Sequence, residues 1–247
     1  MSVRWLHELT RFLTGREAMS DPNAYVARLL ERYEHQPILR GLVQLIPLNI
    51  GAAYESALLT KLNEYRAERL RTFFDELESG RIELSRDVIE SEDFLHSYFA
   101  TLRAVLSTRR RQKIRYLARL MKSAFSADRF ESVDQYEELL AIVDDLSFRE
   151  LVALSILAEC ETATPQEAIE NELQRANKLW PAFEKKVADR LGISATDLSP
   201  LLTRLQRSGC YAEITGGYYD YTGGRGRLTS LYYAIAKLAG NFADISE

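Results

Sequence analysis

Cysteine is scarce in this sequence: Cys160 and Cys210 are the only two among 247 residues, and they share no CxxC spacing. Both stand among apolar residues, so we expect two free, buried thiols in a reducing compartment and place the chain in the cytoplasm. The opening residues, MSVRWLHELTR, carry charges every few positions and lack the apolar core of a secretory signal.

Long apolar runs are also missing. The most apolar region, residues 38–59, has only 14 consecutive uncharged residues, at 41–54. A spanning helix needs roughly 20, so we expect no membrane-spanning segment. Peripheral action on a membrane surface, through residues 38–59 and a basic helix further along, stays open as an alternative.

Patterns that carry catalysis or bind metal are absent. His7, His35 and His96 fall in separate expected helices without ligand spacing, and no GxxxxGK[ST], GxSxG or HExxH occurs. Pairs of Asp and Glu are numerous, but each lies on an exposed helix face where solvation is the ordinary role. We therefore expect a protein that is not an enzyme, with no catalytic residue, no cofactor and no metal.

Glycine and proline are few, at 12 and 6 residues, which favours long helices joined by short turns. Hydrophobic residues at 46% and charged residues at 28% are typical of a globular protein. In the first third of the chain, proline positions and apolar spacing predict helices at 3–13, at 22–36, between Pro37 and Pro47, and at 51–77.

A basic segment is followed directly by an acidic one. Residues 94–127 contain eight Lys or Arg and no acid, whereas residues 130–146 contain six acids and no Lys or Arg. The two predicted helices either pair and neutralise each other, or the basic one binds nucleic acid, anionic lipid or an acidic protein. Its densest part is a secondary basic patch of Arg109, Arg110, Arg111 and Lys113.

Two capping boxes follow. Ser147 and Glu150 open an apolar helix, and we place the boundary between residues 1–146 and 147–247 there. A second box at Thr164–Glu167 predicts a helix that runs to about Lys178 and breaks at Trp180-Pro181.

The region 183–247 predicts two helices, a hairpin and a last helix. Gly192 ends the first helix, and Leu198, Leu201, Leu202 and Leu205 give the second its buried face. Because Pro200 would be costly inside a helix, we expect a late start, with Asp197 as N-cap.

Residues 211–215 and 218–222 predict strands joined by Gly216-Gly217. Residues 223–227 then predict a mobile basic tip, and Thr229 caps a final helix.

The segment LGISATDLSPLLTRLQRSGC resembles the turn and recognition helix of bacterial winged-helix regulators. The resemblance implies double-stranded DNA as a partner, with arginines on the wing and polar side chains on the recognition helix making the contacts. Against this, residues 182–247 carry a net charge of only +1. A non-enzymatic scaffold that binds a protein partner, or itself as a homodimer, is the alternative. The candidate DNA-binding residues are Arg225, Arg227, Arg204, Arg207, Thr203 and Gln206.

A wider resemblance covers about half of the chain. The order KIRYLARLMKSAF, YEELLAIVDDLSFRELVALSIL, LSPLLTRLQRSGC and RLTSLYYAIAKL is similar to the C-terminal half of abortive-infection-alpha-type proteins. It implies a place in anti-phage defence and brings no catalytic residue. The expected fold is mainly α: an N-terminal helical bundle followed by a C-terminal winged helix–turn–helix domain with one small β-hairpin.

Overall fold

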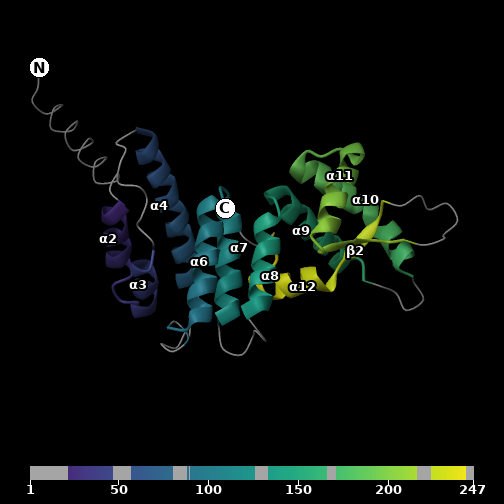
Figure 1. Ribbon diagram of the computed structural model, residues 1–247. Coiled ribbons are helices and arrows are strands. Elements are labelled where there is room, and N and C mark those ends of the chain that lie inside the picture. Colours follow the sequence, from purple (N-terminus) through teal and green to yellow (C-terminus); the bar gives the residue numbers. More distant parts are fainter. Residues whose placement is uncertain are drawn as a thin grey trace, which may run out of the picture.

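The computed structural model describes residues 22–46, 57–79, 88, 90–125, 133–165, 171–215 and 224–242. These residues form ten helices and one antiparallel pair of short strands, so the expected mainly α class is confirmed. The molecule is elongated, with α2 (Pro22–Arg32) and α3 (Pro37–Gln44) at one end and α9, α10 and α11 at the other (Figure 1). The helix expected at 3–13 lies outside the described residues.

Four helices form the middle of the molecule: α4 (Ala57–Glu78), α6 (Glu92–Ser107), α7 (Arg111–Phe125) and α8 (Val133–Asp145). Helix α7 is central, because it packs against α4, α6 and α8 and also against the last helix of the chain. Its apolar face is fully buried at Ile114 and Leu117. The helices predicted at 22–36, between Pro37 and Pro47, at 51–77 and in the acidic segment are found within the described residues, whereas the basic segment 94–127 forms two helices, α6 and α7. Ser91 caps α6 by accepting the N–H of Phe94 at 3.2 Å.

The second half begins with α9 (Phe148–Ala163), α10 (Glu172–Leu191) and α11 (Ala195–Arg207). The capping box at Ser147 is confirmed, since Ser147 Oγ accepts the N–H of Glu150 and the Glu150 carboxylate accepts the N–H of Ser147. Gly192 ends α10 in the left-handed conformation at φ 64°, which a glycine adopts without a steric cost. The four leucines expected on the inner face of α11 are buried.

The predicted break at Trp180-Pro181 is wrong, because α10 runs through both residues. Pro181 is exposed, so the carbonyl of Asn177 that loses its intrahelical donor also lies on the solvent side, where water can hydrate it. Trp180 and Phe183 are buried, and their packing holds the helix together across the proline. The capping box of α10 lies at Asn171 and Gln174, whereas Thr164 ends α9.

The predicted late start of α11 is also wrong. The N-cap is Ser194, and Pro200 lies inside the helix on its exposed side. The Ser194 hydroxyl donates to the Asp197 carboxylate at 2.6 Å, and the backbone N–H of Asp197 donates to Ser194 O at 3.0 Å. This short first turn forms three residues earlier than the proline rule suggested, because Leu198 and its neighbours are already held in the core.

The hairpin pairs β1 (Tyr211–Glu213) with β2 (Gly226–Leu228) in antiparallel register, Tyr211 opposite Leu228. The expected second strand at 218–222 and the turn at 216–217 lie outside the described residues. Residues 226 and 227 were expected in a mobile tip, but they belong to the strand. Gly226 is required there, because a Cβ would lie 2.3 Å from the Ala212 carbonyl oxygen and 2.3 Å from the Tyr211 ring.

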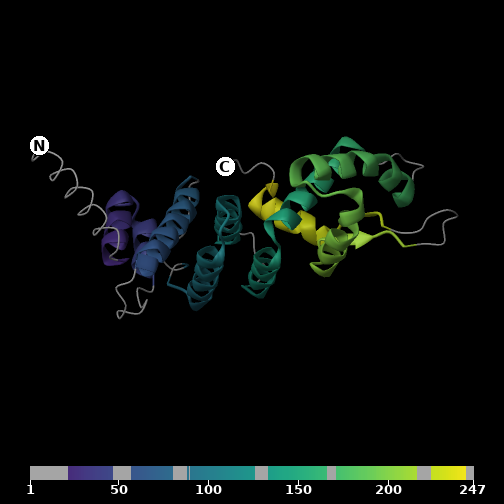
Figure 2. The same ribbon diagram turned by 90° about the horizontal axis from the view of Figure 1, so that it is seen from above.

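The last helix, α12 (Ser230–Ala239), runs back from the hairpin to the central helices (Figures 1 and 2). Ser123 on α7 donates its hydroxyl to Leu238 O at 2.6 Å. Phe242 places its ring against Tyr116 at 5.3 Å and against Phe148 at 5.7 Å. One hydrophobic core therefore extends from the central helices across Ser147 into the second half.

None of the described helices combines the length and the apolar character that crossing a bilayer requires.

Candidate nucleic-acid interface

Arg204 projects from α11 onto α9. Its Nε lies 3.0 Å from Glu150 Oε1, and its Nη2 donates to Glu150 Oε2 at 3.1 Å. The Glu150 side chain is only 4% exposed, whereas that of Arg204 is 53% exposed. The bidentate contact occupies the face of the guanidinium fork that a phosphate would use.

The two arginines expected on the wing both reach α10. Arg225 donates through Nη1 to the Asn177 side-chain oxygen, and its backbone carbonyl accepts the N–H of Ile214 at 2.9 Å. The Nε of Arg227 lies 3.2 Å from Glu172 Oε2. Both contacts are exposed to solvent, so they hold the strand against α10 weakly and compete with any outside partner.

The other candidates form an exposed ridge on α11. Gln206 and Arg207 follow Thr203 by three and four residues, so both lie on its side of the helix, and all three side chains are exposed. The Thr203 hydroxyl donates to the carbonyl of Ser199 at 3.0 Å. The structure thus brings these three side chains together and turns Arg204 towards α9.

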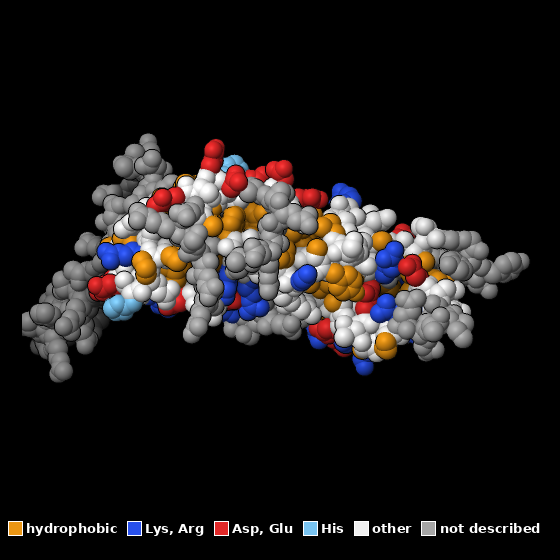
Figure 3. Space-filling view, turned by 90° about the horizontal axis from the view of Figure 1, so that it is seen from below, with side chains coloured by type: hydrophobic (Ala, Val, Ile, Leu, Met, Phe, Trp, Pro, Cys, Tyr) orange, Lys and Arg blue, Asp and Glu red, His pale blue; other side chains and the backbone are white. Residues whose placement is uncertain are grey.

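Basic side chains of α10 are neutralised in the same way. Glu159 on α9 accepts hydrogen bonds from Lys186 at 2.9 Å and from Arg190 at 2.7 Å. Partial burial alone would raise the pKa of Glu159, but the hydrogen bonds from these two cations outweigh it and lower the pKa below its usual value. Figure 3 shows one face of the molecule. At the end formed by α9, α10 and α11, the Lys and Arg side chains on this face are scattered among acidic and apolar ones and form no single patch.

Sequence reasoning missed Glu161, which joins three elements. Its buried carboxylate accepts the backbone N–H of Leu228 in β2 at 2.9 Å and the hydroxyl of Tyr233 in α12. Next to it, Arg175 donates to the carbonyls of Glu161 and Thr164 at 2.8 and 2.9 Å, and so caps the end of α9. The sequence offered little signal, because α9 also contains Glu150 and Glu159 and the partners of Glu161 lie 67 and 72 residues away.

The four residues of the secondary basic patch have separate surroundings. The Arg110 guanidinium stacks over the Phe148 ring at 4.8 Å. Lys113 is buried, and its Nζ donates to the carbonyls of Asp144 and Leu146 at 2.7 and 2.8 Å, where it caps α8. Burial lowers the pKa of Lys113, although nearby acids oppose the shift. Arg109 and Arg111 line a cavity beside α4.

The acids that neutralise α7 lie on α4. Arg111 pairs with Glu68, and Arg119 Nε lies 2.7 Å from Glu76 Oε1, with Arg115 at 3.9 Å from the other oxygen. Internal pairing of the basic helix is therefore present, but the expected partner, the acidic helix that follows it, is wrong for these three arginines. Sequence proximity suggested α8, whereas α4 makes the more extensive contact with α7.

Comparisons with protein-family models, with curated proteins and with solved structures find no match for this chain. We therefore assign it to no family.

Proposed function

We propose that residues 147–242 form a winged helix–turn–helix module whose function is to bind a protein partner rather than DNA. The order α9, α10, turn, α11, β1, β2 is that of a three-helix module followed by a two-stranded wing. In this proposal α11 is the recognition helix and the hairpin is the wing. Arg227 lies in strand β2, and Arg225 directly precedes that strand.

One observation carries the choice of a protein partner: three of the four arginines expected to reach DNA are partly engaged inside the module, in a half of the chain that has no net positive charge. Arg204 contacts Glu150, Arg225 contacts Asn177, and Arg227 contacts Glu172. A protein that binds DNA without other help needs several cations directed at phosphates. Residues 147–247 contain 11 Lys or Arg and 13 Asp or Glu, so this half carries a net charge of −2.

The outer face of α11 supports the same proposal. Between Asp197 near its start and Arg207 at its end, the exposed side chains are mainly small or uncharged, including Ser199, Pro200 and Thr203. Such a surface gives up little hydration when it is covered by another protein, because few charges need to be desolvated.

Site-specific photocrosslinking tests the proposal. A photoreactive amino acid at Gln206 places the probe in the middle of the ridge, and the same probe at Arg103, which is exposed on α6, is the matched control. We expect a protein adduct at 206 and not at 103 that persists at about 0.5 M salt, where exposed charge pairs are screened. Sedimentation then distinguishes a second copy of this chain from a different protein. Nucleic acid crosslinked at 206 would overturn the proposal.

DNA binding is the second candidate, and the exposed ridge of Thr203, Gln206 and Arg207 is the observation in its favour. Hydroxyl, amide and guanidinium groups are the side chains that contact phosphates and base edges. In this case Arg207→Ala reduces duplex binding, whereas Arg204→Ala acts mainly on stability. Electrophoretic mobility shifts of the two variants, with their unfolding curves, separate these effects.

A further inference from the structure

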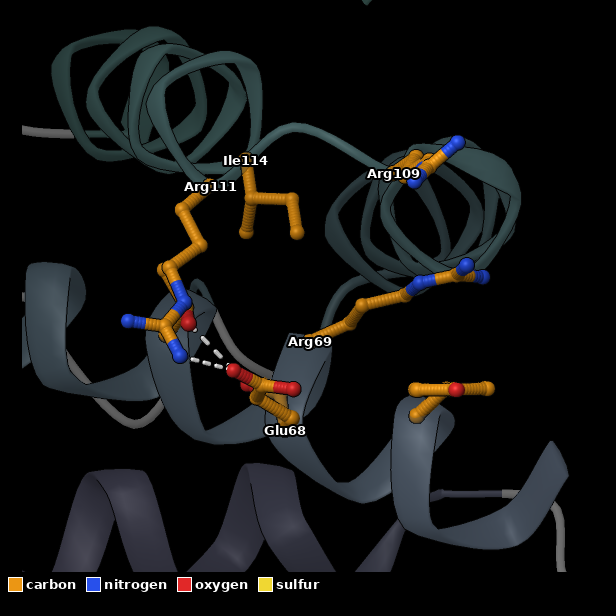
Figure 4. Close-up of a pocket in the computed structure, with 7 residues that line it drawn as sticks. Glu68, Arg69, Arg109, Arg111 and Ile114 are labelled. Atoms are coloured by element: carbon orange, nitrogen blue, oxygen red, sulfur yellow. Dashed lines mark hydrogen bonds and ion pairs between the residues drawn. The ribbon is translucent and has the colours of Figure 1, made fainter. Parts of the chain in front are cut away.

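A cavity of about 400 Å³ lies between α4, the link from α6 to α7, and the first turn of α7. Its volume is within the range of small-molecule sites. In Figure 4, Arg111 extends from α7 towards Glu68, and Ile114 points into the space. Arg69 extends from α4 away from Arg111, and Arg109 lies on the far side of the space with its side chain directed outward.

Positive charge dominates the described lining, with three arginines against one acid. Arg111 uses Nη2 to contact Glu68, and Arg69 uses Nη1 to contact the carbonyl of Leu106. A guanidinium has five N–H groups, so both arginines retain donors after these contacts. Arg109 is exposed, and no ion pair joins it to any acid in the described part of the chain.

The cavity also has an apolar side. Tyr65 is the most exposed of the large hydrophobic side chains described, at 55%, and Ile114 forms a fully buried floor. A tyrosine ring exposed beside arginines offers a flat surface on which a planar group can stack, and that contact removes apolar surface from water.

We propose that this cavity binds a phosphate-bearing small molecule with a planar ring, of mononucleotide size. Guanidinium groups bind phosphate with two parallel hydrogen bonds, and they stay charged at all physiological pH values. The Tyr65 ring stacks on the planar part, Arg111 binds the phosphate through its remaining donors, and the exposed Arg109 side chain turns inward to bind it from the other side. This site is separate from α11 and the hairpin, so it does not depend on what the second half of the chain binds.

Isothermal titration calorimetry at low salt with adenosine 5′-monophosphate, adenosine and inorganic phosphate tests the proposal. We expect the nucleotide to bind with a Kd below about 1 mM and at least about tenfold more tightly than either part alone. Arg109→Ala weakens nucleotide binding by about tenfold or more, because it removes one guanidinium from the rim. Arg103→Ala, which removes another exposed charge outside the cavity, is the control.

Tyr65→Ala is the second variant, and it changes an exposed side chain that the fold does not need. It abolishes the preference for the nucleotide over inorganic phosphate. Three results overturn the proposal: no binding of either phosphate compound, equal binding of adenosine and the nucleotide, or equal losses for Arg109→Ala and Arg103→Ala.

Discussion

The guanidinium of Arg204 on α11 contacts both carboxylate oxygens of Glu150 on α9, at 3.0 and 3.1 Å. The same carboxylate accepts the N–H of Ser147 at 2.7 Å, so one buried acid both caps α9 and anchors α11. An arginine whose type and position suggested a contact to DNA is therefore first a contact within the protein.

Arg204→Ala is expected to lower the free energy of unfolding by about 1–2 kcal/mol. Removing a partner from a buried acid is costly, but Arg204 is half exposed, so water offsets part of the loss. Arg207→Ala, three residues further on and exposed, is expected to stay within about 0.5 kcal/mol of the wild type. Urea unfolding monitored by circular dichroism measures both. Equal effects would show that the contact between α11 and α9 contributes nothing specific.

Glu161→Ala is expected to destabilise the protein by about 2 kcal/mol, because the buried N–H of Leu228 loses its acceptor. Glu161→Gln keeps an oxygen that accepts the Leu228 N–H, and its NH2 group can donate to the Tyr233 hydroxyl, so we expect a loss below about 1 kcal/mol. Hydrogen exchange of the Leu228 amide reads the contact directly. It accelerates in Glu161→Ala and stays slow in Glu161→Gln if the carboxylate holds β2 as the structure shows.

Replacing glycine by alanine at two positions is expected to change the free energy of unfolding in opposite directions. Gly226→Ala places a Cβ against backbone and ring atoms at 2.3 Å, so strand β2 must shift, and we expect a loss of about 1–3 kcal/mol. In Gly41→Ala the new Cβ meets no atom within 4 Å, and α3 gains helix propensity, so we expect a gain of about 0.5–1 kcal/mol. Thermal unfolding of both variants checks the signs. A neutral Gly226→Ala would contradict the observed register of the hairpin.

Five tyrosines are expected to make the protein less stable at alkaline pH. Burial raises the pKa of all five above the usual value of about 10, and a carboxylate that accepts the hydroxyl proton adds to the shift at Tyr33 and Tyr233. Since folding favours the neutral form, the contribution to stability is complete below pH ~10 and is lost as the pH rises further. The five are Tyr33, Tyr98, Tyr116, Tyr136 and Tyr233.

A titration of tyrosinate absorbance alongside circular dichroism checks this dependence. We expect the four buried tyrosines among the 13, Tyr33, Tyr98, Tyr116 and Tyr136, to ionise only as the helical signal is lost, whereas Tyr233 is half exposed and ionises earlier. Ionisation of all the tyrosines in one step near pH ~10, with the helical signal intact, would show that these four are not shielded from solvent.

Helix ends were predictable where the signal is local. Ser147 and Thr229 cap their helices through backbone N–H groups three residues away, so sequence spacing alone identifies them. The leucine spacing of α11 likewise predicted its buried face. Apolar packing then overrode the local cost of Pro181 and Pro200, which sequence rules take as helix breaks.

Pairings between distant segments were not predictable. Strand β1 pairs with residues 226–228, two of which the sequence placed in a tip, and Glu161 holds this strand from a helix far earlier in the chain. The partner of α7 was missed for the same reason, since Glu68 and Glu76 are each 43 residues from the arginine that donates a hydrogen bond to them. Residue type suggested the DNA candidates, but only the folded arrangement shows which are already engaged.

Fluorescence anisotropy with a labelled random-sequence duplex of about 20 base pairs, titrated from about 50 to 200 mM salt, tests the central claim most directly. If the module binds protein rather than DNA, the full-length protein shows no association up to about 100 µM even at the lowest salt, where nonspecific DNA-binding proteins bind readily. Association that weakens steeply with salt and is lost in the Arg225→Ala, Arg227→Ala double variant would contradict it, and the function would then be DNA binding.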